Sequence, residues 1–399
     1  MTLEQRLSVE LAIIKQKDLW RSPALVERLA GPRLVVDGKA LLNFSSNDYL
    51  GLATHPALLA AAEEAMHQFG FGSTASRLLC GTTKEHALLE EELAVVKNTQ
   101  AALLFPTGFA AATGALAALL HYGDVIILDK LAHASLIDGA KASKATLRIF
   151  HHNDLEHLEK QLRFARQKFP QGEILIVTES IFSMDGDAAP LREMVELKER
   201  YGALLFVDEA HAIGVRGLPG KRMGGLVGEL GLSGRVEIQM GTLSKGMGSS
   251  GGYLCASRVM IDYFLHRARS FIYTTAAPAA CIGAARAALH IINSEEGETL
   301  ATQLWKNIHL LAELLPQSTA HSTSDEKVAS AIYPFILGEE KKTLSASHEL
   351  FKQGFFVPAL RFPTVARGAA RLRISLTAAH SAEEIEALVK QITLLDPNP

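Results

Sequence analysis

Residues 204–211 read Leu-Leu-Phe-Val-Asp-Glu-Ala-His, a run of apolar residues that ends in two acids, an alanine and a histidine. Such a run is typical of a strand that is buried on both faces of a parallel sheet. Ligands of these sheets bind at the carboxyl ends of the strands, so Asp208 is expected to lie in a cleft. A carboxylate buried there needs a cationic partner, which the protonated nitrogen of a pyridine cofactor would supply. The residues alone leave a helix N-cap as an equal alternative for Asp208.

The same pattern recurs along the middle of the chain, where short apolar runs alternate with helical segments. This order predicts an α/β fold with a mainly parallel sheet that has helices on both faces. The further strands are predicted at Ala101–Phe105, Val125–Leu128, Leu147–Phe150, Ile174–Thr178 and Val236–Met240. The helices between them are predicted at His86–Lys97, Leu155–Phe169 and Leu191–Tyr201.

After about residue 290 the pattern changes to that of a smaller α+β domain. A long helix at Thr299–Leu315 is followed by a polar, loop-like stretch at Ser318–Asp325. A last helix begins after Ser381, with Glu384 at the spacing of a capping box. The strands are predicted at Ala329–Leu337, Phe355–Pro358 and Leu372–Ser375, and the last helix at Ala382–Leu394. We therefore expect an N-terminal segment (1–50), a large domain (51–290) and a small C-terminal domain (291–399).

Composition argues against several classes of protein. The 399 residues are 48% hydrophobic and carry a net charge of −3, which offers no basic surface for nucleic acid or an anionic membrane. Residues 1–17 are predicted to form an amphipathic helix rather than a signal peptide. The three cysteines, Cys80, Cys255 and Cys281, form no Cys-x-x-Cys pair. The sequence therefore favours a protein of the reducing cytoplasm without disulfides or a metal site.

The segment Gly241–Gly252 places one lysine, Lys245, among small residues after a predicted strand. A lysine that forms a Schiff base needs this setting, because glycine lets the chain approach a cofactor closely. Burial there would also lower the pKa of the amine so that it can act as nucleophile and base. Thr242 and Ser244 could donate hydrogen bonds to a phosphate. A solvated lysine in a surface loop is the ordinary alternative.

Three other segments place polar or glycine residues just after a predicted strand. Gly108 and Phe109 follow Ala101–Phe105 at a turn into a helix, where backbone N–H groups can bind a phosphate. His133 follows the next strand, and its ring could stack on a planar cofactor. Ser183 lies in a segment with Asp-Gly turn chemistry. Each signal is weak by itself, since turns and solvated histidines are more common than binding sites.

Taken together, the segments resemble the α-oxoamine synthases, a branch of the fold-type I enzymes that depend on pyridoxal 5'-phosphate (PLP). The resemblance covers nearly the whole chain in family order, which makes it far more specific than any one motif. The matching segments are Asn43–Leu52, Thr178–Asp187, Asp208–His211, Gly241–Gly252, Arg361–Val365 and Arg371–Ser375.

The resemblance implies a role for each candidate residue. Lys245 would carry the cofactor and act as base, Asp208 would pair with the pyridine nitrogen, and His133 would stack on the ring. His211 and Ser183 would bond near the ring, and Gly108, Phe109 and Thr242 would contact the cofactor, the glycine and the threonine chiefly at its phosphate. Arg361 would clamp the amino acid carboxylate, since a guanidinium suits a carboxylate bidentately. Arg21, Thr364 and His133 would contact substrate.

Within the family, the resemblance is strongest to the member that condenses L-alanine with a pimeloyl thioester in biotin synthesis. The thioester would be carried by coenzyme A or by acyl carrier protein. The active site would lie at the interface of a homodimer. The segment Ser73–Thr82 instead resembles the sister enzyme that joins glycine to acetyl-CoA, so this reaction stays open. A PLP aminotransferase is the alternative of another class.

Overall fold

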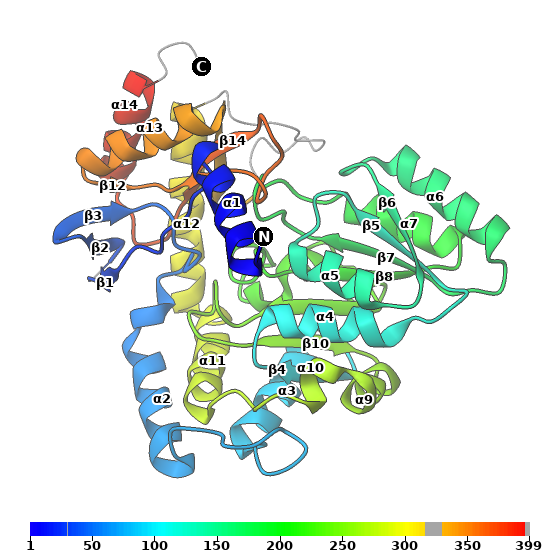
Figure 1. Cartoon of the computed structure of the whole chain (residues 1–399). Helices are drawn as coiled ribbons and strands as arrows, with labels where there is room; N and C mark the ends of the chain where they lie inside the picture. Colours follow the sequence, from blue (N-terminus) through cyan, green and yellow to red (C-terminus); the bar gives the residue numbers. More distant parts are fainter. Residues whose placement is uncertain (30, 316–328, 396–399) are drawn as a thin grey trace.

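The structure, a computed structural model, describes residues 1–29, 31–315 and 329–395. Its centre is a seven-stranded sheet in the order β4-β10-β9-β8-β7-β5-β6 (Figure 1). Strand β10 pairs antiparallel with both of its neighbours, and the remaining pairs are parallel. The strands are β4 (Ala101–Phe105), β5 (Val125–Asp129), β6 (Thr146–Phe150), β7 (Ile174–Glu179), β8 (Leu204–Asp208), β9 (Ile238–Thr242) and β10 (Gly252–Ala256).

Both faces of this sheet are buried, because successive side chains of a strand point to opposite sides. Ile126 and Leu128 of β5 pack with α4, α5, α9 and α10, whereas Val125 and Ile127 pack with α6, α7 and α8. Figure 1 shows α4, α5, α9 and α10 on one side of the sheet and α6 and α7 on the other. The helices are α4 (Gly108–Leu119), α5 (Ala134–Ala142), α6 (Leu155–Lys168), α7 (Leu191–Arg200), α8 (Gly225–Glu229), α9 (Arg258–Arg267) and α10 (Arg269–Ile272).

Two smaller sheets accompany the large one, and the first of them joins the beginning of the chain to its end. Strand β12 (Phe355–Phe356) pairs parallel with β3 (Lys39–Asn43), which continues through β2 (Arg33–Val36) to β1 (Val26–Arg28). The second small sheet has the order β11-β14-β13, formed by Ile332–Gly338, Ala370–Ser375 and Ala359–Leu360. The remaining helices are α1 (Leu3–Gln16), α2 (Pro56–Phe69), α3 (Lys84–Val96), α11 (Ala279–Ile292), α12 (Glu295–Leu314), α13 (Glu340–Lys352) and α14 (Ala382–Leu395).

The predicted α/β architecture is confirmed, with a mainly parallel sheet and helices on both faces. The capping box before α14 is also present, since the backbone N–H groups of Ser381 and Glu384 donate to each other's side chains. The strand predicted at Phe355–Pro358 is wrong in length, because only its first two residues pair. The segment predicted at Ser318–Asp325 lies outside the described residues. Division of the chain near residues 50 and 290 stays a proposal.

Two further findings concern the helices. Helix α1 forms as predicted at the N-terminus, but none of its side chains is buried. Among residues 1–29, 31–315 and 329–395, no helix combines the length and the apolar character that a membrane span requires.

Candidate active site

The carboxyl ends of the parallel strands bring several of the predicted residues to one edge of the large sheet. Asp208 ends β8, Glu179 ends β7, and the two residues are neighbours in the register of these strands. His133 lies four residues after the end of β5, and Lys245 lies three residues after β9. Since parallel strands end at the same edge, the fold itself assembles these groups from distant parts of the sequence.

A cavity of about 220 Å³ opens at this edge. The predicted residues His133, Ser183, His211 and Lys245 all line it. Segments of the two smaller sheets close its other side, so the cavity lies where the beginning and the end of the chain meet the large sheet. Its remaining lining residues are Ser45, Asn47, Met184, Pro358, Leu360 and Arg373.

Lys245 contacts His211 inside this cavity. Its Nζ lies 2.8 Å from Nε2 of His211, whose Nδ1 lies 2.6 Å from the hydroxyl of Tyr49. Burial lowers the pKa of the Lys245 amine, although the carboxylates of Asp208 and Glu179 act in the opposite direction. Burial, and then the charge of Lys245, hold the pKa of His211 well below its usual value. A neutral imidazole therefore lies beside an amine that is easily deprotonated.

Two buried carboxyl groups lie below the cavity. Burial raises the pKa of Asp208, and it raises the pKa of Glu179 well above its usual range. Asp208 accepts a hydrogen bond of 2.9 Å from the backbone of Ala210 through one carboxylate oxygen. Glu179 Oε1 has no hydrogen-bond partner among the described residues. The charge of Lys245 acts on both carboxyl groups and lowers their pKa. A protonated pyridine nitrogen would add a second cation beside them.

Gly108 lies at the start of α4, where the turn packs closely against neighbouring strands. A Cβ added to Gly108 would lie 3.2 Å from Met240 and 3.3 Å from Thr242, and one added to Gly252 would lie 2.5 Å from the Gly108 backbone. Glycine at these two positions therefore lets the turn approach β9 and β10 closely, and Gly108 begins α4, where backbone N–H groups can bind an anion. The Thr242 hydroxyl lies 2.8 Å from that of Ser244, next to this turn. Phe109 is half exposed.

His133 has a structural role as well as its predicted one. Its Nδ1 accepts the backbone N–H of Ser135 at 3.2 Å, so the residue caps the N-terminus of α5. Burial lowers the pKa of its ring. The same ring lines the cavity. Since Nδ1 faces the helix, a neutral His133 carries its proton on Nε2.

Of the four residues predicted to contact substrate, His133 lines the cavity, whereas Arg21, Arg361 and Thr364 lie outside its lining. Arg361 donates hydrogen bonds to the carbonyl oxygens of Asp18 and Trp20, the latter at 3.2 Å. Arg21 donates to Thr364 Oγ1 at 3.2 Å. The structure thus brings Arg21 and Thr364 together, and the roles of Arg21, Thr364 and Arg361 at the substrate stay predictions.

Arg373 lines the cavity where sequence reasoning expected Arg361. Its guanidinium is buried and donates to the Ser183 carbonyl at 2.6 Å, to Ser375 Oγ at 2.7 Å and to Asn47 Oδ1 at 3.0 Å. Asn47 also accepts from the hydroxyl of Tyr49 at 3.2 Å. Arg373, Asn47 and Tyr49 were not predicted as site residues. The available signal was Arg373 itself, a charged residue at a buried position of a strand.

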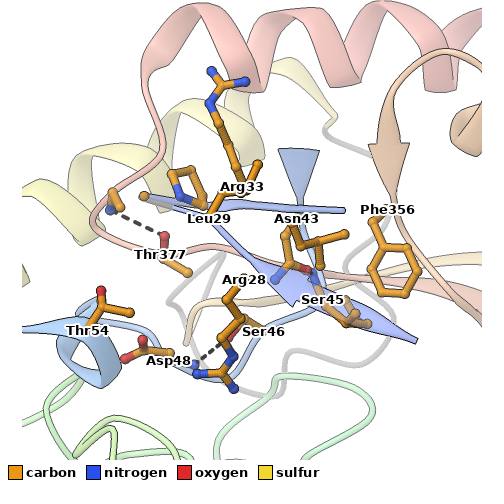
Figure 2. A pocket seen from close by; sticks show the side chains of 16 residues that line it. Arg28, Leu29, Arg33, Asn43, Ser45, Ser46, Asp48, Thr54, Phe356 and Thr377 are labelled. Atoms are coloured by element: carbon orange, nitrogen blue, oxygen red, sulfur yellow. Dashed lines mark hydrogen bonds between the residues drawn. The ribbon is translucent and has the colours of Figure 1, made fainter. Parts of the chain in front are cut away.

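No function is assigned to a second pocket and to a group of possible metal ligands on the surface. A larger pocket of about 450 Å³ lies between the β1–β2 hairpin and the segment that leads to Thr54, and it shares Ser45 with the cavity (Figure 2). None of the predicted site residues lines it. On the surface, His151, Asp154 and His157 could approach one metal ion. Both ring nitrogens of His157 already face other groups, the His151 backbone at 3.0 Å and the Gln161 amide at 2.8 Å.

Comparison with known proteins adds independent findings. Residues 39–392 match the family model for aminotransferase class I and II. The 8-amino-7-oxononanoate synthase of Trichlorobacter lovleyi is 44% identical over 98% of this chain and 97% of its own length. The 8-amino-7-oxononanoate synthase 1 of Bacillus subtilis is 39% identical, with 98% of each chain covered.

Solved structures agree with this result. A serine palmitoyltransferase of S. paucimobilis with bound PLP and myriocin superimposes with a TM-score of 0.91 at 28% identity, covering 100% of this chain and 99% of the other. An 8-amino-7-oxononanoate synthase of Francisella tularensis gives a TM-score of 0.72 at 28% identity, covering 89% of this chain and 98% of the other.

Proposed function

We propose that this chain condenses L-alanine with a pimeloyl thioester. The premise is that the chain belongs to the class I and II aminotransferase family and to its 8-amino-7-oxononanoate synthase branch. The chain is a PLP-dependent acyltransferase, and its product is 8-amino-7-oxononanoate, formed with loss of carbon dioxide and of the thiol carrier. Similarity to the synthases over almost the whole chain is the observation that carries this conclusion. The cavity supplies the chemical groups that the reaction needs.

The residues around the cavity fit PLP. When bound, PLP supplies a cationic ring that stabilises negative charge on the α-carbon of the amino acid. We propose that Lys245 holds it covalently, that Asp208 keeps the ring nitrogen protonated, and that His133 stacks on the ring. His211 and Ser183 would bond near its edge. Gly108 and Thr242 would bind the phosphate beside Phe109, since Gly108 begins α4 and N–H groups at a helix N-terminus can bind an anion.

Lys245 moves the protons of the reaction in this proposal. The amino group of L-alanine would have to replace Nζ on the cofactor before Nζ is free to act as a base. Because burial lowers the pKa of the Lys245 amine, the freed Nζ would be able to take the α-proton of L-alanine. The α-carbon then attacks the thioester carbonyl, a carbon–carbon bond forms, and the thiol leaves. After decarboxylation, the Lys245 ammonium returns a proton to the same carbon.

Arg373 would hold the carboxylate of L-alanine until it leaves as carbon dioxide. Its guanidinium lies in the wall of the cavity and is fixed by three hydrogen bonds. Arg21 and Thr364, which contact each other beyond the cavity, are proposed to meet the acyl partner. Coenzyme A and acyl carrier protein present the same thioester arm, so the proposal covers both carriers.

We also propose that the chain forms a homodimer with the active site at the interface. An isolated antiparallel β-bridge between Ser76 and Thr275 joins the segment that contains Leu79 to the segment that contains Tyr273. Leu79 is 80% exposed and Tyr273 is 70% exposed in the single chain. Phe109, a predicted cofactor contact, is also half exposed. Exposed apolar side chains that gather near a site favour a surface that a second copy covers.

Mass spectrometry of the product tests the proposed function. Purified enzyme with PLP, L-alanine and pimeloyl-CoA is expected to give the mass of 8-amino-7-oxononanoate, and glycine with acetyl-CoA is run alongside. Product from the glycine reaction alone would show that the substrates are those of the sister enzyme. A Lys245→Ala variant is expected to give no product, and normal turnover by this variant would disprove the role of Lys245.

A further inference from the structure

A buried histidine outside the cavity contacts two carboxylates at once. His152 follows β6, the edge strand of the large sheet. Its Nδ1 lies 3.0 Å from Oδ1 of Asp129, and its Nε2 lies 2.8 Å from Oδ2 of Asp187. The side chains of the three residues are 12%, 0% and 8% exposed, respectively. The ring of Phe182 packs edge-on against the imidazole, with 4.3 Å between the ring centroids.

This geometry favours a charged imidazole, although burial raises the pKa of the Asp187 carboxyl. Ionised carboxylates only accept hydrogen bonds, so both ring nitrogens of His152 must donate. Burial by itself would lower the pKa of the ring, but the hydrogen bonds and charges of Asp129 and Asp187 outweigh it and raise the pKa to about 10. Replacing the imidazolium by a neutral ring would leave buried negative charge without compensation.

The two carboxylates belong to the loops that carry two predicted cofactor contacts. Asp129 ends β5 and also accepts the backbone N–H of Leu131 at 2.8 Å, at the start of the turn that leads to His133. Asp187 closes the loop that contains Ser183, and its carbonyl accepts the backbone N–H of Phe182 at 3.0 Å. The imidazolium thus joins the loop of His133 to the loop of Ser183 from outside the cavity.

We propose that His152 is a positioning residue for the cofactor site. Its imidazolium fixes the separation of the two loops, so that the His133 ring and Ser183 meet the cofactor ring from set positions. Asn153 strengthens the same link, because its backbone N–H donates to Asp129 at 3.1 Å and its amide donates to Asp187 at 2.8 Å. The inference rests on the proposed function only in that the cavity binds PLP.

The His152→Gln variant tests this proposal in the full-length enzyme. A glutamine amide can donate to one carboxylate but cannot bridge both with a positive charge, so the two loops lose their fixed spacing. We expect the Kd for PLP to rise and the visible circular dichroism of the bound cofactor to change at temperatures well below unfolding. Turnover should fall roughly 10- to 100-fold, as small displacements of catalytic groups can cause.

A matched control separates positioning from general stability. Lys198 forms another ion pair, with Glu237, and its side chain is 6% exposed. Lys198→Gln makes the same change from cation to amide away from the cavity, and it is expected to lower Tm without altering PLP affinity or the cofactor spectrum. If His152→Gln behaves like this control, the role of His152 is purely structural and the proposal is wrong.

A second variant covers the case in which His152→Gln does not fold. Asp187→Asn keeps the pair between His152 and Asp129 but weakens the link to the Ser183 loop, and it should change the cofactor spectrum in the same direction. An unchanged PLP Kd and spectrum in this variant would contradict the proposal. Both readouts need PLP alone, so they remain valid if the acyl substrate differs from the one proposed above.

Discussion

Two arginines at the end of the chain show how strongly the surroundings of a residue decide its chemistry. Arg361 and Arg373 both belong to segments that resemble the family, but Arg361 bonds the carbonyl oxygens of Asp18 and Trp20, whereas Arg373 lines the cavity. Replacing Arg373 by Gln is expected to raise KM for L-alanine roughly 10- to 100-fold, because a hydrogen bond to a charged group contributes about 1.5–3 kcal/mol. Steady-state kinetics with Arg361→Gln as the control provide the check. Equal increases in KM in both variants would restore Arg361 as a candidate clamp.

From the charge of His152 we also predict how the free energy of unfolding depends on pH. Its pKa is raised to about 10 in the folded chain, compared with about 6.5 in an unfolded chain. The stabilisation is therefore complete below pH 6.5 and is lost as the pH rises towards 10, with a slope of at most about 1.4 kcal/mol per pH unit. Urea unfolding of the wild type and His152→Gln should show a difference in stability that shrinks over this range. A difference that is constant from pH 6 to 10 would contradict a charged His152.

At the scale of elements, the first turn of α5 combines two tasks in one side chain. His133 caps the helix through Nδ1 and lines the cavity with the same ring. Asparagine is a good N-cap, so His133→Asn is expected to keep Tm near that of the wild type, whereas His133→Ala should lose about 1 kcal/mol. Both variants lose the ring and should alter the absorption spectrum of bound PLP. A normal spectrum in His133→Asn would argue against stacking by His133.

The sequence predicted the elements of the central sheet better than the rest of the fold. Buried parallel strands are short apolar runs, so β4 to β9 could be located within a few residues. Strand β10, which begins in the glycine-rich segment at Gly252, was not predicted. The strands at both ends of the chain are short, and β3 and β12 pair across more than 300 residues, which local patterns cannot show. Arg373 was missed for the same reason, because Ser183 and Asn47 are close to it only in the folded chain.

At the scale of the whole molecule, two buried histidines link the stability of the fold to pH. Burial lowers the pKa of His86 and of His380 to about 4. Their contribution to stability is present above pH 6.5 and is lost as the pH falls through 4, because the unfolded chain binds the protons more readily. The two groups together give a slope of up to about 2.7 kcal/mol per pH unit in this window. Calorimetry of wild type and His380→Asn from pH 7 to 4 should show a steeper fall in the wild type.

The exposed apolar side chains of the single chain also lead to a prediction about its assembly. The exposed side chains of Leu79 and Tyr273 lie on linked segments, and burying them against a second copy would stabilise a dimer. Leu79→Glu is therefore expected to shift sedimentation at micromolar concentration from dimer to monomer. Activity should fall with it, because the proposed interface contains the active site. Leu394, which is 70% exposed on α14, gives the control Leu394→Glu, which should stay dimeric and active. A Leu79→Glu variant that remains dimeric with full activity would place the interface elsewhere, whereas an active monomer would show that one chain completes the site alone.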